Sequence, residues 1–335
     1  MRLASRLLLA LLLAATGASA AEIPTTEQLR AMYRRPEVVP FPAANAHTPE
    51  RAMLGRILFF DPRLSSSNLL SCASCHNPSF GWGDGQALGR GHGMVRLGRR
   101  SPTVLNAAWG GPFFWDGRAP TLEAQAAGPI AAAVEMNMPL AELPGKLAGI
   151  AGYAPLFEAA YPGEGITVAT ITRAIATFER TIVAGRSDFD RWVDGDDGAI
   201  SAAARRGLDV FQNEGRCAAC HSGWPFTDNR FHDIGLPTGD IGRAEFDPAN
   251  PLARHAFKTP GLRDTVRRAP YMHNGVLADL EAVVRFYETG GQRRPSLSPL
   301  MQPLSLTDRQ REDLLAFLAT LSAPIQEFRA PTLPR

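Results

Sequence analysis

The chain has 335 residues, of which 35 are basic and 33 acidic, so its formal net charge at pH 7 is only +2. Removing residues 1–20, which contain Arg2 and Arg6, leaves 33 residues of each sign (35 minus 2). A chain this close to neutral has no polybasic field that would hold nucleic acid or anionic lipid, and its length suits two domains.

The first twenty residues have the pattern of a secretory signal. Two arginines precede an apolar run, and the run ends at Ala18-Ser19-Ala20, which fits an A-x-A cleavage site. A membrane anchor is the alternative, but the run is too short to cross a bilayer comfortably, and no later stretch is apolar enough. We therefore expect cleavage after Ala20 and a soluble protein exported to the periplasm, with no membrane span.

Short helical patterns precede two cysteine motifs of the chain. The first is ERAMLGRILFF at 50–60, and the second is AARRGLDVF at 203–211. Near the C-terminus, residues 306–321 are amphipathic and begin with Thr307, with Gln310 three positions later, which is the pattern of a capping box. No stretch alternates in a way that supports a sheet. The expected fold class is all-α, with long loops rich in proline and glycine.

All four cysteines of the chain stand in two C-x-x-C-H motifs. Two disulfides or one shared zinc ion are alternatives for four cysteines in an exported chain, but neither explains the histidine that follows each pair. C-x-x-C-H is the attachment signature of a c-type haem, with the histidine as the proximal iron ligand. We therefore predict two covalent haems. The residues are Cys72, Cys75 and His76 in the first motif and Cys217, Cys220 and His221 in the second.

The spacing of the motifs predicts one haem in each of two domains. Cys72 and Cys217 are 145 positions apart (217 minus 72). The acidic, glycine-bearing stretch at 190–201 lies between them and has the composition of a linker. We expect an N-terminal haem domain at 21–195 and a C-terminal haem domain at 196–335.

An internal repeat follows the two haem motifs. Residues 101–125 and 259–283 both begin near a proline, reach a glycine 15 positions after that proline, and contain Leu-Glu-Ala in register. The register makes chance similarity a poor explanation. The two halves can therefore be compared position by position.

The repeat predicts that the two haems differ. Trp115 falls opposite His273, and Pro129 falls opposite Tyr287. Tyrosine can ligate haem iron, whereas proline cannot. If these positions approach the distal faces, one iron is closed by a side chain and the other stays open to a small oxidant. That asymmetry favours an enzyme over a pure electron carrier.

Motifs along the whole mature chain resemble the bacterial dihaem cytochrome c peroxidase and MauG superfamily. The resemblance implies two cytochrome c-like domains, with a peroxide-reacting haem in the N-terminal half and an electron-transfer haem in the C-terminal half. The motifs are LGRILFFDPRLSSS, SCASCHNPSFGWGDG, SPTVLNAA, FFWDGRAPTLEAQAAGPI, VEM, CAACH and APYMHNG.

The resemblance also implies catalytic roles where the motifs match. Trp115 of FWDG looks like the family's tryptophan between the haems, where an indole shortens the electron path. Glu135 of VEM looks like the distal glutamate that moves a proton between the oxygens of peroxide. Gln125 of EAQA looks like its pocket partner. The alternatives are a core tryptophan, a surface glutamate and a helix-surface glutamine.

His92 and Tyr287 are the candidate distal iron ligands. His92 lies in a GHG loop that, in the family's peroxidases, ligates the first haem in the resting oxidised state; a loop histidine that never reaches the iron is the alternative. At the position of Tyr287 the peroxidases have a methionine, and tyrosine is the MauG arrangement. Met272 or Met301 is the alternative ligand of the second iron.

Other residues receive lesser roles from the resemblance and the repeat. His232 and His273 are expected to line or support the second haem pocket without binding iron. Glu123 falls opposite Glu281 in the repeat and is expected to be structural. For His47 and His255 we expect only surface positions.

Bound calcium is doubtful in this chain. The family often holds Ca²⁺ between its domains with an asparagine side chain and backbone carbonyls. Arg100 stands where the asparagine would be, and one carbonyl would belong to Arg268. Two guanidinium groups beside a hard-cation site disfavour calcium.

The first functional hypothesis is a periplasmic dihaem peroxidase that reduces hydrogen peroxide with electrons from a small c-type cytochrome or a copper protein (a cupredoxin). The alternative is a MauG-like enzyme that uses the same haem chemistry to oxidise a tryptophan or tyrosine of a partner protein. A dihaem electron carrier is a remote third. The sequence does not indicate an oligomeric state.

Overall fold

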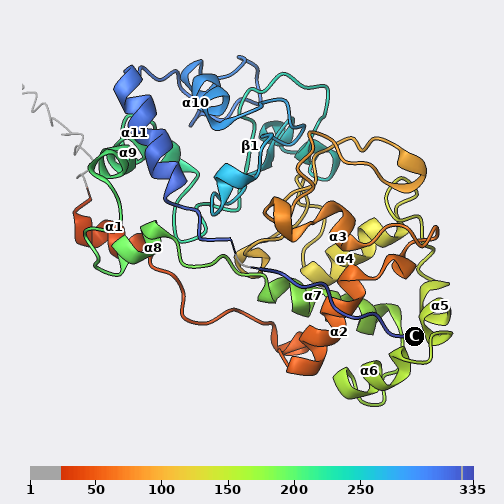
Figure 1. The fold of residues 1–335 in the computed structure, drawn as a ribbon. Coiled ribbons are helices and arrows are strands. Elements are labelled where there is room, and N and C mark those ends of the chain that lie inside the picture. The colour runs from red at the N-terminus through yellow and green to blue at the C-terminus, as the bar shows by residue number, and fades with distance from the viewer. Residues whose placement is uncertain (1–23, 326) are drawn as a thin grey trace, which may run out of the picture.

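A computed structural model describes residues 24–325 and 327–335, so the predicted signal peptide lies outside the described residues. Within them the chain is mostly helical, as expected (Figure 1). The helices are α1 Thr26–Tyr33, α2 Pro49–Phe60, α3 Cys72–Cys75, α4 Leu122–Ala131, α5 Leu143–Ala148, α6 Tyr153–Ala160, α7 Val168–Thr181, α8 Asp188–Val193, α9 Ala202–Gln212, α10 Leu280–Glu288 and α11 Asp308–Ala319. Two strands, β1 Phe231–His232 and β2 Phe257–Lys258, form a short antiparallel ladder that was not predicted. No helix among the described residues is long and apolar enough to span a membrane.

Local sequence fixes where the main helices begin. The patterns at 50–60 and 203–211 correspond to α2 and α9. The capping box before α11 is present as predicted: the Thr307 hydroxyl accepts the Gln310 amide proton at 3.2 Å, and the Gln310 side chain accepts the Thr307 amide proton at 2.9 Å. These reciprocal bonds satisfy backbone donors that have no partner inside the helix.

Each half of the molecule is built on one close helix crossing. α2 packs on α7, and α9 packs on α11. A Cβ added to Gly55 would lie 1.9 Å from the Ala174 carbonyl oxygen, and one added to Gly207 would lie 1.9 Å from the Asp313 carbonyl oxygen. Only glycine allows the backbones to approach this closely. The same device in both halves agrees with the internal repeat.

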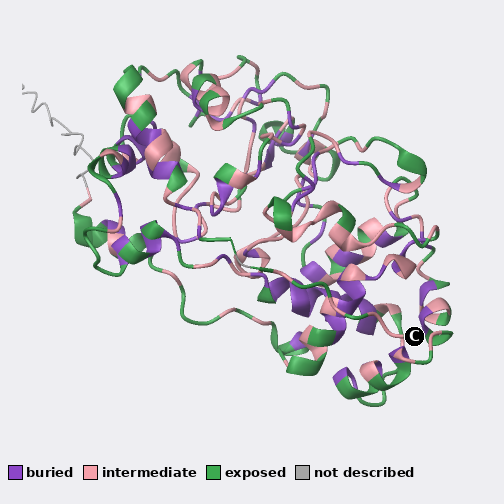
Figure 2. Ribbon diagram, in the orientation of Figure 1, coloured by how far each residue is buried: buried purple, intermediate pink, exposed green. Residues whose placement is uncertain are grey.

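The buried side chains form two apolar cores, which Figure 2 shows as purple segments in two regions of the ribbon. One core gathers around α2, α4, α6 and α7, and Cys72 packs at its edge. The other gathers around α1, α8, α9 and α11, and Cys217 packs at its edge. Each haem motif therefore borders its own core.

The two ends of the chain pack on the opposite cores. Leu29 and Tyr33 of α1 belong to the second core. Phe328 and Leu333, near the C-terminus, pack against the first core, where Figure 1 shows the C-terminal segment passing α2 and α6. Each core is thus completed by a distant part of the chain, and the proposed division after residue 195 remains a prediction.

The linker prediction for residues 190–201 is wrong at its start. α8 covers Asp188–Val193, with Ser187 and Asp190 forming a capping box. Trp192 and Val193 are buried in the second core. The carboxylate of Asp190 pairs with buried Arg263 at 3.0 Å. The acidic composition suggested a linker, but the first residues of this stretch belong to a helix whose apolar face is buried.

Candidate haem sites and the cavities around them

The first C-x-x-C-H motif presents its histidine in the form that binds iron. α3 carries both cysteines, and His76 follows at its C-terminal end. The Nδ1 atom of His76 lies 3.3 Å from the carbonyl oxygen of Trp82. Because a carbonyl only accepts, Nδ1 carries the proton and Nε2 keeps its lone pair. Burial lowers the pKa of His76 and outweighs the opposite effect of the bond to Trp82, so the ring is neutral and ready to ligate.

The second motif repeats this arrangement. Cys217–Ala219 form a single 3₁₀ turn, and Nδ1 of His221 lies 2.9 Å from the carbonyl oxygen of Phe226. Burial also lowers the pKa of His221. All four cysteines are free thiols, and the two pairs line different cavities. This separation rules out disulfides between the two motifs and leaves no single place for a zinc ion shared by all four cysteines.

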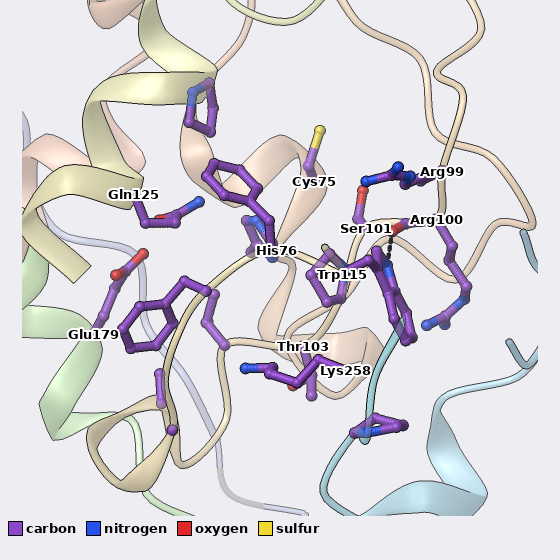
Figure 3. Close-up of a pocket in the computed structure, with 18 of the residues that line it drawn as sticks. Cys75, His76, Arg99, Arg100, Ser101, Thr103, Trp115, Gln125, Glu179 and Lys258 are labelled. Carbon is purple, nitrogen blue, oxygen red and sulfur yellow. Dashed lines mark hydrogen bonds between the residues drawn. The ribbon is translucent and has the colours of Figure 1, made fainter. Parts of the chain in front are cut away.

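The first cavity has a volume of about 510 Å³. Its walls include the first haem motif together with Gln125, Pro129 and Glu135. In Figure 3, Gln125 of α4 lies on one side of this cavity, Trp115 lies on the other, and His76 lies between them. The predicted catalytic side chains are therefore gathered around one proximal histidine, and proline stands where the second half has tyrosine.

Glu135 lies in the turn after α4 and lines the first cavity. Burial raises the pKa of its carboxyl, and the charge of Arg118 offsets this only in part. A carboxyl whose pKa is raised in this way is a better proton acceptor than an exposed glutamate, and it can return the proton that it accepts. The position and the electrostatics support the proton-transfer role, which remains a prediction.

The loop of His92 is tied to the Glu135 turn. The His92 amide donates to the carbonyl oxygens of Val134 at 3.2 Å and Glu135 at 2.8 Å. A Cβ on Gly91 would lie 1.9 Å from the Val134 carbonyl oxygen, so this contact needs glycine. Gly91 lines the cavity, whereas the His92 ring is not among the lining residues, although its Nδ1 is buried without a partner. Iron ligation by His92 remains a prediction.

The second cavity is smaller, at about 200 Å³. Tyr287 of α10 lines it together with His221, and so do Met272 and Met301. Burial raises the pKa of Tyr287 strongly, and the nearby motif thiols raise it further. The phenol therefore keeps its proton unless a cation such as ferric iron binds its oxygen. Tyr287 as the distal ligand is supported by this placement and remains a prediction.

Trp115 lines both cavities. Its Nε1 donates to the Arg100 carbonyl oxygen at 2.8 Å, and its own carbonyl accepts from the Lys258 amide at 2.8 Å. Its ring meets His273 edge-on at 6.4 Å between centroids. The indole is thus held rigidly in the wall between the two sites, where the proposed electron path needs it.

Three further histidines line the second cavity. His273 stacks on Phe257 at 3.6 Å between ring centroids, and Nε2 of His232 lies 2.8 Å from Asp228. His255 also lines the cavity, and its Nδ1 is 2.6 Å from the Asp240 carbonyl oxygen. The expectation that His255 is a surface histidine is therefore wrong, because β2 and the turn before it carry His255 inward.

The wall between the cavities suits the acidic edges of two haems. The Nε atoms of Arg100 and Arg268 are buried without hydrogen-bond partners among the described residues, and both side chains line both cavities. Burial lowers the pKa of Lys258, in the same wall, to about 8. Unpaired buried cations cost free energy, and haem propionates are anions that would pair with them. The residues present therefore fit two haems.

Arg100 also bears on the question of calcium. Its Nη2 donates to the carbonyl oxygen of Arg268 at 2.8 Å. That carbonyl is the oxygen which the resemblance assigned to a calcium ion. A guanidinium group already holds it, which supports the prediction that this chain does without calcium.

One cavity residue was missed by the sequence analysis. Glu179 of α7 is buried and lines the first cavity. A signal was present, because Glu179 lies four positions after Ile175 and next to Phe178, on the apolar side of an amphipathic helix. A carboxyl at such a position indicates either a buried partner or a function.

The fold and these cavities define a class: a mainly helical protein whose two C-x-x-C-H motifs are consistent with two covalent haem sites, one beside an open cavity. Residues 49–198 match the family of di-haem cytochrome c peroxidases, and the chain belongs to that family. It is therefore a dihaem peroxidase-family enzyme, and membership implies hydrogen peroxide as the oxidant.

Relatives lie on both branches of the family. The chain is 52% identical to the methylamine utilization protein MauG of Methylorubrum extorquens, over 95% of this chain and 92% of the relative. It is 45% identical to MauG of Methylophilus methylotrophus, over 98% of each. Cytochrome c peroxidases match at 30% to 36% identity. Among solved structures, a MauG-like protein associated with microbial copper homeostasis aligns with a TM-score of 0.79 and 30% identity, covering 86% of this chain and 94% of that one.

Proposed function

We propose that this chain is a MauG-like enzyme, which uses hydrogen peroxide and two haems to oxidise a tryptophan or tyrosine side chain of a partner protein. The order of the two enzyme hypotheses from the sequence is thereby reversed. The identity to MauG proteins, 45% and 52%, exceeds that to cytochrome c peroxidases, which reaches 36%. We also propose a role in methylamine utilization, the process for which both MauG relatives are named.

The placement of Tyr287 in the second cavity is the observation that carries this proposal. A thioether ligand favours ferrous iron and suits a haem that collects electrons from a small donor. A phenolate is a hard anion that favours ferric and higher states. Tyr287 lines the cavity with the second haem motif, so the second site is suited to holding oxidising equivalents.

Each residue of the two cavities then has a separate role in the proposed reaction. His76 and His221 would each hold a haem iron, the first supplying the reaction with peroxide and the second a store of oxidising equivalents. Glu135 takes a proton from one peroxide oxygen and returns it to the other, while the Gln125 amide orients the oxidant. Trp115 connects the two cavities, so that electrons drawn from the partner protein reach the first site.

We propose the periplasm as the location, because the N-terminal signal pattern directs export and haem attachment through C-x-x-C-H uses the free thiols of an exported chain. The partner is then an exported protein with an accessible aromatic side chain. The donor of the peroxidase hypothesis, a small c-type cytochrome or a cupredoxin, is not needed for this reaction.

A dihaem peroxidase is the second candidate function, and one observation favours it. The GHG loop of His92 is bonded to the Glu135 turn, which is where a gating loop for the first haem would be anchored. Turnover of peroxide with reduced cytochrome c would assign the chain to this class.

The Tyr287→Phe variant tests the proposal. We expect a changed absorption spectrum of the second haem in Tyr287→Phe and an unchanged one in the controls Met272→Leu and Met301→Leu, because only the phenol binds iron. The wild-type oxidised protein should show no methionine-to-iron charge-transfer band. A methionine band that survives Tyr287→Phe but disappears in either methionine variant would return the chain to the ordinary peroxidases.

A further inference from the structure

A carboxyl group that the proposed function leaves unused stands in the wall of the first cavity. Glu179 is 4% exposed and lines the cavity from α7. Figure 3 shows its carboxyl group on the same side of the cavity as the Gln125 amide. Its Oε2 atom is buried and has no hydrogen-bond partner among the described residues. The carboxyl is therefore presented to the cavity without a protein group that would hold it as an anion.

The neighbouring arginine does not pair with Glu179. Arg180 donates from Nη1 and Nη2 to the two oxygens of Glu123 at 2.7 and 3.1 Å, and Asn45 donates to the same carboxylate at 2.8 Å. Glu123 is thus the structural carboxylate that the repeat predicted. A buried carboxyl without such partners costs folding free energy that a leucine would not. Packing does not account for a glutamate at position 179.

The surroundings of Glu179, taken together, favour its neutral form. Arg180 on α7 and Glu123 on α4 are its charged neighbours, and the charge of Arg180 opposes the neutral form. The sulfur of Cys72 on α3 lies nearby, and α2 presents apolar side chains to α7. Burial is the largest effect and raises the pKa of Glu179 to about 8. At neutral pH the side chain is a protonated acid. Across the same cavity, Lys258 also has a pKa of about 8, lowered by burial.

We propose that Glu179 is a proton-supplying acid of the first cavity, distinct from Glu135. It gives its proton to the cavity while peroxide is reduced there and recovers one from water afterwards. The proposal rests on the proposed function for the identity of the oxidant. The geometry that carries it is a buried carboxyl, without an ion-pair partner, in the wall of the cavity that holds the proximal histidine and Gln125.

The proton balance requires such a source. Reduction of hydrogen peroxide to two water molecules breaks the O–O bond and takes up two electrons and two protons. The electrons come from the oxidised side chain of the partner protein. Glu135 moves a proton that peroxide already carries, so it adds none. Glu179 supplies one of the two protons by breaking its own O–H bond, and the second is taken from solvent. The carboxylate that remains on Glu179 is then protonated again from solvent.

An infrared titration of the resting dihaem protein tests the assignment without peroxide or partner. We expect a protonated-carboxyl C=O band, shifted by exchange into D₂O, that disappears as the pH rises through about 8. The band should be missing in Glu179→Gln and retained in the control Glu142→Gln, which removes an exposed carboxyl group outside the cavity. Because Glu135 also has a raised pKa, the titration is repeated in Glu135→Gln, where the band near pH 8 should persist.

Kinetics give a second, independent measurement. We expect the steady-state rate of peroxide reduction, measured with ascorbate as the electron donor, to fall as the pH rises through about 8 in the wild type. In Glu179→Gln the rate should be at least about tenfold lower at neutral pH, and it should not fall as the pH rises through this range. Lys258→Met is the control for the other group that titrates in this range, and its rate should still fall as the pH rises through about 8.

Several outcomes would overturn the proposal. A C=O band that persists in Glu179→Gln would assign the titration to another group. So would a fall in rate near pH 8 that persists in Glu179→Gln and disappears in Lys258→Met. If Glu179→Gln loads too little haem, the band in wild type and Glu135→Gln decides, and its absence removes Glu179 as an acid. Failure to oxidise any partner protein would count against the proposed function, whereas the infrared titration would still decide the state of Glu179.

Discussion

Replacing Glu135 by glutamine separates proton transfer from the shape of the first cavity. Glutamine keeps the volume of the side chain and removes only its ability to exchange a proton. Arg118, the charged neighbour of Glu135, still pairs with Asp116 at 2.7 Å. No buried charge is therefore left unpaired, and we expect normal haem loading and an unchanged resting spectrum.

The expected loss follows from the role assigned to Glu135. A positioned general acid–base group contributes about 10²–10⁴-fold to rate, or about 2.7–5.4 kcal/mol of barrier. Burial raises the pKa of Glu135, so its base form is complete only above that raised value. The full ratio between wild type and Glu135→Gln should therefore appear at higher pH. It should shrink as the pH falls through the pKa, because the wild type then loses its base.

Stopped-flow absorbance is the assay, with the second-order rate of the haem spectral change measured against peroxide concentration. Glu142→Gln is the control, since it removes an exposed carboxyl group that does not line the cavity. Wild-type rates in Glu135→Gln, within a factor of about three at high pH, would show that Glu135 transfers no proton and that the mechanism needs another base.

Three further predictions follow from the same structure. Pyridine haemochrome should report two c-type haems per chain, and a haem-stained denaturing gel should show the band at the mature mass; one haem or bound zinc would contradict both sites. The Arg100 guanidinium already holds the Arg268 carbonyl oxygen, so chelation of Ca²⁺ should leave the wild-type spectrum unchanged. Calorimetry should show a gain of Ca²⁺ affinity only in Arg100→Asn. Gly207→Ala should lower the free energy of unfolding by about 3 kcal/mol or more, since its Cβ would lie 1.9 Å from a carbonyl oxygen; the control Gly98→Ala, with nothing within 4 Å, should melt like the wild type.

Local patterns in the sequence determined the haem motifs and the helices that frame them. The C-x-x-C-H spacing is itself the chemistry of attachment, so no tertiary information was needed to find His76 and His221. The helices α2, α9 and α11 were predictable because their caps and apolar stripes lie within one segment. The repeat also paired Pro129 with Tyr287, and the structure shows them in the walls of different cavities.

Only the tertiary structure decided how charged and polar groups are shared among distant segments. The composition of residues 190–201 predicted a linker. In the structure, Trp192 is buried in the second core with residues of α1 and α11, so the start of this stretch belongs to that core. Arg180 pairs with Glu123 rather than with adjacent Glu179, because α4 crosses α7 on that side. Protonation states and ion pairs depend on which surfaces meet after folding. The sequence could therefore predict the haem ligands, but it could not show that a second buried acid lies in the first cavity.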